Sequence, residues 1–290
     1  MFEGFDLEMI ETPEATIRVR HGGSGPPLLL LHGHPQTHVM WHLVAPRLAE
    51  EFTVVCPDLR GYGDSSKPQT TSDHEPYSKR AMARDQIEVM RRLGFERFAV
   101  AGHDRGGRVA YRMALDHPET VSRLAVLDII PTGEHYRRTD MSFALGYYHW
   151  FFLAQPFDLP ERLIGADPDY YYLARRASSS LVFAPEALAD YRRCWNDPAT
   201  IHAMCEDYRA GATYDFALDE ADRGQRRIEC PLLALWGSKG PVGTWYDVLS
   251  LWRDWAGDVR GRAIESGHHI PEEAPDDTYQ ELRDFFSEYV

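Results

Sequence analysis

The stretch FAVAGHDRGGR (98–108) decides the fold, because it predicts a strand, a sharp turn and a helix start in direct succession. The apolar run that ends at Gly102 predicts a buried strand, and residues 106–116 have the pattern of a helix. Gly102 and Gly106 lack a Cβ atom, so strand and helix can approach closely around the turn. The pattern is that of the G-x-S-x-G turn, which exposes a nucleophile, with Asp104 in the place of the serine.

Strands and helices alternate along most of the chain. The predicted strands are residues 28–31, 52–58, 98–102, 123–129, 231–237 and 259–266, and the predicted helices are 79–93, 106–116, 244–256 and 276–289. A hairpin is predicted over residues 5–20, turned at HGGSG (21–25). This alternation favours an α/β protein with a mostly parallel sheet that is flanked by helices on both faces.

The middle of the chain departs from this alternation. Between Pro131 and about Arg223 the sequence is rich in aromatic residues and has helical patterns, as in YYHWFF (147–152) and YRRCWND (191–197). We interpret it as a helical cap inserted over the strand ends. The predicted division is a first core segment, the cap and a second core segment, which are residues 1–131, 132–222 and 223–290.

Charge and composition exclude several classes of protein. The 290 residues include 31 Lys and Arg against 45 Asp and Glu, a net charge of −14, which disfavours binding to nucleic acid. No apolar run reaches the roughly 18 residues of a membrane span, and the acidic start of the chain lacks the features of a secretory signal. The four cysteines are scattered, as is typical of a reducing compartment. We therefore predict a cytoplasmic protein that does not bind nucleic acid or membranes.

An aspartate at the turn indicates a particular chemistry. The start of the following helix favours an ionised carboxylate at Asp104, although an ordinary helix-capping aspartate is the alternative. A carboxylate is a poor acyl nucleophile, but it displaces good leaving groups at saturated carbon and forms an alkyl-enzyme ester. Water must then hydrolyse the ester. Halide displacement and epoxide opening are the two reactions that this nucleophile predicts.

Two further residues are predicted to complete the catalytic set. His268 lies in the late loop SGHHIP (266–271), where a base that activates water is expected. The strand PLLALWG (231–237) is followed by SKG, without a carboxylate. We therefore assign the acid to Asp128, at the end of the preceding strand, where a plain loop aspartate is the alternative. The backbone N–H groups of His34 and Arg105 are predicted to form an oxyanion hole.

Two arginines follow the nucleophile closely. Arg105 and Arg108 are three residues apart at a helix start and therefore share a face near Asp104. Two guanidinium groups suit a substrate carboxylate, which they can bind through paired hydrogen bonds, while surface ion pairs are the alternative. The spacing of His34, His38 and His42 is that of a helical zinc site, but Pro35 disfavours a helix there. We predict neither a metal nor a cofactor.

The chain resembles the fluoroacetate dehalogenases of the α/β-hydrolase superfamily. The matching stretches are HGHPQTHVMWH (32–42), DLRGYGDSSKP (58–68), GHDRGGR (102–108), ALDHP (114–118), LDIIPT (127–132), YHWFFLAQP (148–156), EDYRAG (206–211), WGSKG (236–240) and SGHHIPEE (266–273). The resemblance implies hydrolysis of a short haloacid such as fluoroacetate or chloroacetate. It also implies a homodimer, and it gives Asp104, His268 and Asp128 the three catalytic roles.

The same resemblance implies a binding site in the predicted cap. Arg105 and Arg108 would hold the substrate carboxylate, and three cap residues would surround the leaving halide, namely His149, Trp150 and Tyr208. Tyr214 is the nearby alternative to Tyr208, and plain aromatic packing is the alternative for all three cap residues. His34 departs from the resemblance, because an aromatic or aliphatic residue is expected at its position.

Three other functions compete with haloacid hydrolysis. An epoxide hydrolase would use the same Asp–His–Asp set with cap tyrosines as acids, for which the candidates are Tyr147, Tyr148, Tyr208 and Tyr214. A ligand-binding protein without activity would have no need of an intact catalytic set. A serine esterase would need the serine that Asp104 replaces.

Overall fold

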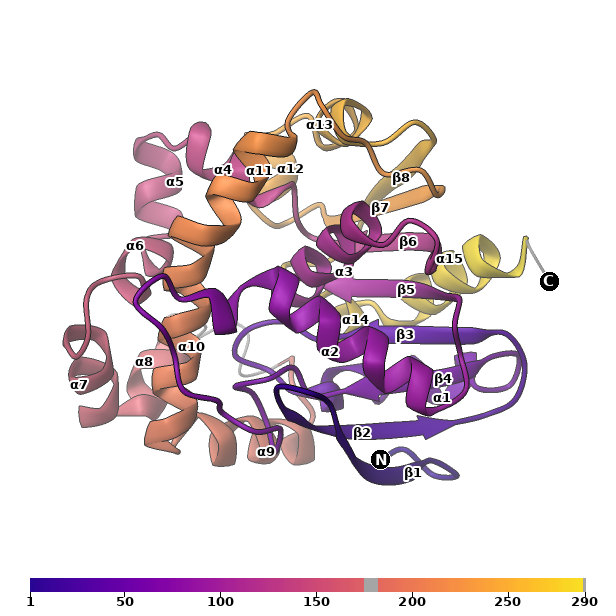
Figure 1. The fold of residues 1–290 in the computed structure, drawn as a ribbon, viewed down its shortest axis with the longest axis horizontal. Helices are drawn as coiled ribbons and strands as arrows, with labels where there is room; N and C mark the ends of the chain where they lie inside the picture. The colour runs from indigo at the N-terminus through magenta and orange to yellow at the C-terminus, as the bar shows by residue number, and fades with distance from the viewer. Residues whose placement is uncertain (175–181, 289–290) are drawn as a thin grey trace.

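An eight-stranded sheet forms the centre of the computed structural model, which describes residues 1–174 and 182–288 (Figure 1). The strands lie in the order β1-β2-β4-β3-β5-β6-β7-β8. They comprise β1 (Asp6–Glu11), β2 (Thr16–Gly22), β3 (Pro27–Leu31), β4 (Thr53–Pro57), β5 (Phe98–His103), β6 (Val121–Leu127), β7 (Leu232–Gly237) and β8 (Val259–Ile264). The pairs β1–β2 and β2–β4 are antiparallel, and all the others are parallel, which confirms the predicted α/β fold.

The amino-terminal hairpin forms, but its predicted turn was wrong. The strands β1 and β2 turn at Thr12–Ala15, where the N–H of Thr12 donates to the carbonyl of Ala15 at 2.8 Å. The segment HGGSG (21–25) instead covers the end of β2 and the start of the connection to β3. The sequence TPEA (12–15), with Pro13, therefore makes the tight turn, while the glycines lead the chain into the parallel part of the sheet.

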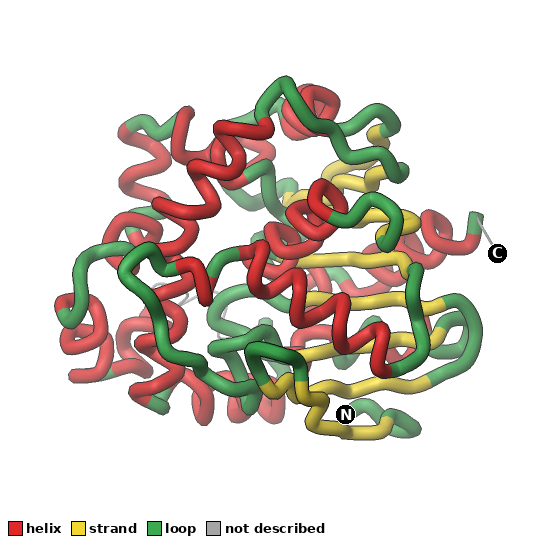
Figure 2. The backbone as a smooth tube through the Cα atoms, in the orientation of Figure 1, coloured by secondary structure: helices red, strands yellow, loops and turns green. Residues whose placement is uncertain are grey.

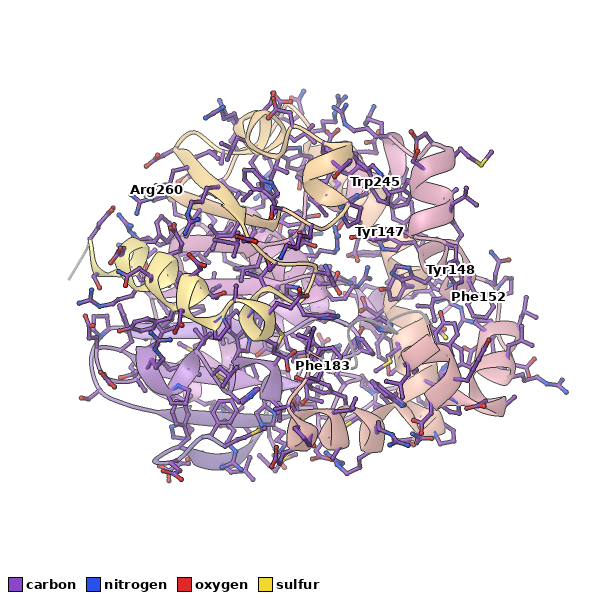
Figure 3. The ribbon with its side chains drawn as sticks, turned by 180° about the vertical axis from the view of Figure 1, so that it is seen from behind. Tyr147, Tyr148, Phe152, Phe183, Trp245 and Arg260 are labelled. Atoms are coloured by element: carbon purple, nitrogen blue, oxygen red, sulfur yellow. The ribbon has the colours of Figure 1, made fainter. Side chains whose placement is uncertain are left out.

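Helices cover both faces of the sheet. The helices α2 (Lys79–Arg92) and α3 (Arg105–Asp116) lie on one face, and α15 (Pro275–Ser287) lies on the other (Figures 1 and 3). This double cover explains the leucine run of β3, since Leu28–Leu31 are fully buried in the middle of the sheet. Other short helices of the core are η1 (His38–Trp41), α1 (Ala45–Leu48), η2 (Glu75–Tyr77) and α14 (Ile270–Glu273).

The helix predicted over 244–256 was also wrong, because the chain forms two helices there. They are α12 (Val242–Trp245) and α13 (Val248–Trp255). Tyr246 has an extended backbone between them, and the side chain of Asp247 accepts from the N–H of Ser250 at 3.0 Å. This cap starts a new helix and satisfies one of its first N–H groups.

Helices make up most of the described part of the segment between β6 and β7. Its helices are α4 (Thr132–Arg137), α5 (Met141–Gly146), α6 (His149–Leu153), α7 (Leu159–Ala166), α8 (Pro168–Ala174), α9 (Pro185–Trp195), α10 (Pro198–Ala210), the π-helical turn η4 (Gly211–Asp215) and α11 (Phe216–Asp222). In Figure 2 they gather to the left of the sheet, beyond the carboxyl ends of the parallel strands. Residues 175–181 of the predicted cap lie outside the described residues.

In the described part of the chain, every helix is too short or too polar to cross a membrane.

Candidate active site

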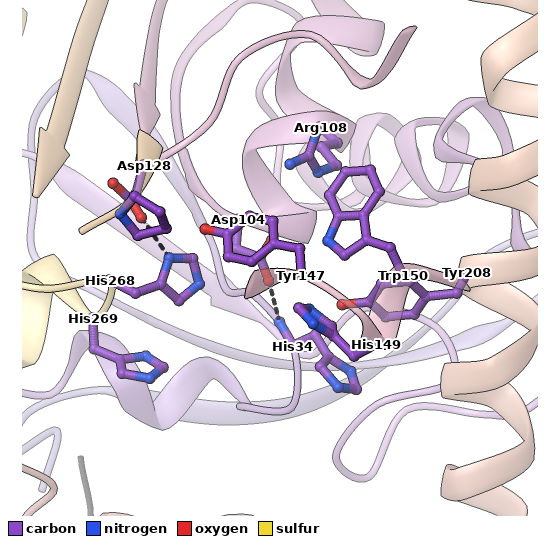
Figure 4. A pocket seen from close by; sticks show the side chains of 11 residues that line it. His34, Asp104, Arg108, Asp128, Tyr147, His149, Trp150, Tyr208, His268 and His269 are labelled. Carbon is purple, nitrogen blue, oxygen red and sulfur yellow. Dashed lines mark hydrogen bonds and ion pairs between the residues drawn. The ribbon is translucent and has the colours of Figure 1, made fainter. Parts of the chain in front are cut away.

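A cavity of about 140 Å³ lies between the strand ends and the helices α6 and α10. Its lining combines ionisable groups from the strand ends with aromatic residues from the helical segment (Figure 4). The lining residues are His34, Asp104, Arg108, Asp128, Tyr147, His149, Trp150, Tyr208, Pro241, His268 and His269. Ligands of open parallel sheets bind at the carboxyl ends of the strands, so this cavity is in the expected place.

Asp104 stands on the sharp turn between β5 and α3. Its backbone has φ 47° and ψ −115°, a conformation that a residue with a side chain adopts only under strain. Gly102 and Gly106 make the turn possible, because a Cβ atom on Gly102 would lie 2.4 Å from the carbonyl oxygen of Gly106. The turn brings the buried carboxylate to the cavity wall.

Hydrogen bonding and charge keep the Asp104 carboxylate ionised. The backbone N–H of His34 donates to Oδ2 of Asp104 at 3.0 Å. Burial alone would raise the pKa of this carboxyl, but the positive charges of His268 and Arg108 outweigh burial and hold the pKa below its ordinary value. The helix α3 begins at Arg105, and the side chain of Asp104 does not cap it with a hydrogen bond.

His268 and Asp128 form a close pair beside the nucleophile. Nδ1 of His268 lies 2.6 Å from Oδ2 of Asp128, and the N–H of Gly237 donates to Oδ1 of the same carboxylate at 3.0 Å. The carbonyl of His268 accepts a hydrogen bond from Nε2 of His103 at 2.7 Å. In Figure 4 the imidazole of His268 lies between Asp128 and Asp104. The structure therefore brings together the three residues chosen from the sequence.

The two arginines lie in different surroundings. Arg108 lines the cavity, and its Nη1 donates to the carbonyl of Ile130 at 3.1 Å and to Oγ1 of Thr132 at 3.2 Å. Arg105 does not line the cavity. Its guanidinium group lies 4.2 Å from the ring centre of Tyr208. Two of its nitrogens donate to the carboxylate of Asp207, Nε at 2.9 Å and Nη2 at 2.6 Å.

The three residues expected around a halide all line the cavity. His149 and Trp150 start α6, and Tyr208 comes from α10. The ring of Tyr208 lies 5.8 Å from the ring of His149 and 6.2 Å from that of Trp150. Tyr214 is not among the lining residues, which favours Tyr208 over this alternative.

The sequence analysis missed or undervalued several residues of the site. His269, the neighbour of the predicted base, lines the cavity, and its Nδ1 lies 3.3 Å from Oε1 of Gln36. Asp207 was not considered, although it stands in the matched stretch EDYRAG beside Tyr208. Its partner Arg105 lies far away in sequence, so only charge complementarity between the two could have suggested the pair. Among the described residues, no three His, Cys, Asp or Glu side chains gather in a way that could hold a metal ion.

Comparison with known proteins decides the family. Residues 26–275 match the family model of the alpha/beta hydrolase fold. A fluoroacetate dehalogenase from Burkholderia sp is 51% identical over 292 residues, which cover 99% of this chain and 96% of that protein. The chain belongs to the haloacetate dehalogenase family of the α/β-hydrolase superfamily.

Other relatives of this dehalogenase-family chain have different names. A soluble epoxide hydrolase from Corynebacterium sp. (strain C12) is 37% identical, with 91% of each chain covered. A crystal structure of a protein from Nostoc sp PCC 7120, assigned to the alpha/beta hydrolases, has a TM-score of 0.96 and 56% identity over 99% of each chain. The family membership predicted from the sequence is thus confirmed. Relatives of the chain are named for two reactions, dehalogenation and epoxide hydrolysis.

Proposed function

We propose that this enzyme hydrolyses short 2-haloacids, such as fluoroacetate or chloroacetate, to glycolate and a halide ion. One observation carries the proposal: the buried carboxylate of Asp104 shares a cavity with the His268–Asp128 pair and with the cation of Arg108. A nucleophile, a base and an anion-binding group are the three parts that this reaction needs.

In the first step, one oxygen of Asp104 attacks the carbon that carries the halogen. The new C–O bond forms as the carbon–halogen bond breaks, and the halide leaves with the bonding electrons. The product is a carboxymethyl ester of Asp104. The lowered pKa of this carboxyl supports the step, because the nucleophile is then charged throughout the neutral range.

In the second step, water attacks the carbonyl carbon of the ester. His268 takes a proton from the water, and Asp128 stabilises the imidazolium ion that forms. The N–H groups of His34 and Arg105 donate to the oxygen that becomes negative. Collapse of the intermediate releases glycolate and restores the Asp104 carboxylate, and one proton leaves to solvent in each cycle.

Recognition of the acid depends on the two arginines. Arg108 donates to the substrate carboxylate from the cavity wall. Arg105, whose guanidinium group packs against the ring of Tyr208, adds a second donor. A charge-assisted hydrogen bond in a water-poor cavity is stronger than one in bulk solvent, which favours charged substrates over neutral ones.

The leaving halide is stabilised by donors from the helical segment. The imidazole of His149, the indole N–H of Trp150 and the hydroxyl of Tyr208 surround it. Fluoride needs such donors most, because the small ion depends strongly on its solvation. Residues 132–222 therefore act as a cap that supplies the halide site, while 1–131 and 223–290 form the catalytic core.

Epoxide hydrolysis is the second candidate function. Tyr147 and Tyr208 line the cavity and could protonate an epoxide oxygen, and one relative is named as an epoxide hydrolase. Burial raises the pKa of Tyr147 well above its ordinary value, with the carboxylates of Asp128 and Asp104 adding to the effect. Such a phenol is a weak acid, and the cation of Arg108 suits a carboxylate better than an uncharged epoxide.

We also infer a cytoplasmic homodimer. All four cysteines carry free thiols, which fits a reducing compartment. Several large apolar side chains are exposed on the helical segment, as expected of a subunit interface. They include Met141, Leu145, Tyr148, Phe157, Leu163 and Tyr170, of which Tyr148 is labelled in Figure 3.

The proposed function is tested by assaying halide release from fluoro-, chloro- and bromoacetate, with diol formation from a styrene-type epoxide measured in parallel. We expect halide release from the haloacetates and little epoxide turnover. Efficient epoxide opening without halide release would favour the second candidate. No turnover of either substrate class by folded protein would contradict both.

A further inference from the structure

We propose that Asp207 is a positioning residue that orients Arg105 toward the carboxylate of the substrate. The inference rests on the haloacid hydrolysis proposed above and deepens it. It assigns part of the substrate specificity to a residue that does not line the cavity. Asp207 immediately precedes Tyr208 on α10, so one short segment would control both ends of the bound haloacid.

Asp207 holds the guanidinium group of Arg105 from one side. Oδ2 of Asp207 accepts from Nε of Arg105 at 2.9 Å, and Oδ1 accepts from Nη2 at 2.6 Å. Nη2 also donates to the backbone carbonyl of Asp207 at 2.7 Å. Both side chains are fully buried. Paired contacts of this kind fix the plane of the guanidinium group as well as its position.

Other buried groups hold Asp207 in turn. The hydroxyl of Tyr62 donates to Oδ2 at 2.6 Å, and Nζ of Lys79 donates to Oδ1. Lys79 also contacts Asp215, with Nζ 3.3 Å from Oδ2. Burial alone would raise the pKa of Asp207, but Arg105 and Lys79 lower it, so the carboxylate is charged. Two cations and two carboxylates therefore form a balanced cluster that connects α2, α3 and α10.

The contacts with Asp207 do not involve the third guanidinium nitrogen of Arg105, Nη1. Nη1 is buried and donates to no acceptor among the described residues. A buried guanidinium donor without an acceptor is costly, and it indicates that a ligand completes the site. The guanidinium carbon lies 4.2 Å and 5.8 Å from the ring centres of Tyr208 and Trp150, which both line the cavity (Figure 4). A substrate carboxylate in that cavity is the acceptor that Nη1 lacks.

Charge and orientation predict opposite effects of removing Asp207. The negative charge of Asp207 opposes the binding of an anion. If Asp207 served only to balance charge, its removal would therefore improve substrate binding. Removal of an orienting residue would do the reverse, because without its carboxylate Arg105 would be held less firmly. Asp207→Asn therefore distinguishes the two roles, since it keeps the shape while replacing one acceptor oxygen with an NH₂ donor.

The test compares Asp207→Asn with Asp215→Asn. Asp215 belongs to the same charged cluster and contacts Lys79, but among the described residues it makes no hydrogen bond or ion pair with Arg105. We expect Asp207→Asn to raise the KM for chloroacetate, and the inhibition constant of unreactive acetate, at least roughly tenfold, the equivalent of one charge-assisted hydrogen bond. Asp215→Asn should change both by less than about twofold, as for a site without direct contact. Equal changes in the two variants, or tighter binding after Asp207→Asn, would overturn the proposal.

Two further variants keep the test decisive. In an Arg105→Leu background, Asp207→Asn should add no further loss of acetate binding, because the two residues act as one unit. If Asp207→Asn does not fold, Tyr62→Phe removes one hydrogen bond from Asp207 without changing any charge. It should raise the inhibition constant of acetate measurably, and an unchanged constant would refute the inference. Halide release by the unmodified enzyme is measured first, so a failure of the proposed function is recognised separately.

Discussion

Nδ1 of His268 lies 2.6 Å from Oδ2 of Asp128, although 140 residues separate the two along the chain. Asp128 follows β6, and His268 stands in the loop after β8. The second oxygen of Asp128 accepts the N–H of Gly237 at the end of β7. Three neighbouring strand ends therefore determine the position and orientation of one imidazole.

Replacement of Asp128 by asparagine should slow ester hydrolysis by roughly 10²–10⁴-fold, because the variant loses the charge that stabilises the imidazolium ion. The first step should be affected much less. Rapid-quench experiments with chloroacetate should then show a burst of chloride equal to the enzyme concentration, followed by slow turnover. Steady-state rates close to those of the unmodified enzyme would mean that another carboxylate supports His268.

The variant His268→Asn should complete alkylation and then stop. Only the second step needs a base, so the ester should accumulate on the enzyme. Mass spectrometry after incubation with chloroacetate should find a carboxymethyl group on the peptide that contains Asp104. Folded, inactive protein without this adduct would show that His268 acts before or during halide displacement.

Arg108→Leu should lower kcat/KM for chloroacetate by at least a factor of roughly ten, equivalent to the ~1.5–3 kcal/mol of a hydrogen bond to a charged group. Arg108 is the arginine that lines the cavity, so the loss should depend on the charge of the substrate. Chloroacetamide has the same leaving group and no charge. Equal losses for the acid and the amide would exclude Arg108 from carboxylate recognition.

Trp150→Phe should reduce fluoroacetate turnover more than bromoacetate turnover. The change keeps an aromatic ring in the cavity and removes one N–H donor, on which the smaller fluoride ion depends more strongly. Trp195→Phe is a matched control, because Trp195 is buried in α9 and does not line the cavity. A larger fall with bromoacetate, or the same ratio of rates as in the control, would leave Trp150 as a packing residue.

The parts of the site that follow from local sequence could be predicted. Adjacent residues encode the turn at Asp104. A Cβ atom on Gly102 or on Gly106 would lie 2.4 Å from a backbone oxygen, so the turn requires glycine at both positions. Asp128 was found at the end of a predicted strand and His268 just after one, and parallel strands end at one edge of the sheet. Predictions of this kind need strand order, but no side-chain geometry.

The parts that depend on distant packing could not be predicted. The pairing of Arg105 with Asp207 joins residues from α3 and α10, and no periodicity in the sequence relates these two helices. The break between α12 and α13 depends on a single capping contact of Asp247 within an apolar stretch that is compatible with one continuous helix. The turn at 12–15 was missed because the glycine-rich segment after it is a stronger turn signal in isolation.

The central claim is that Asp104 is alkylated during turnover. A single turnover of chloroacetate by excess enzyme in ¹⁸O-labelled water tests it most directly, with the oxygen isotopes of glycolate and of the Asp104 peptide measured by mass spectrometry. If water hydrolyses an ester at the Asp104 carbonyl, one labelled oxygen enters the Asp104 carboxylate, and the new hydroxyl oxygen of glycolate comes unlabelled from the enzyme. Labelled glycolate in the first turnover, with Asp104 unlabelled, would mean that water attacks the substrate directly and would contradict the mechanism.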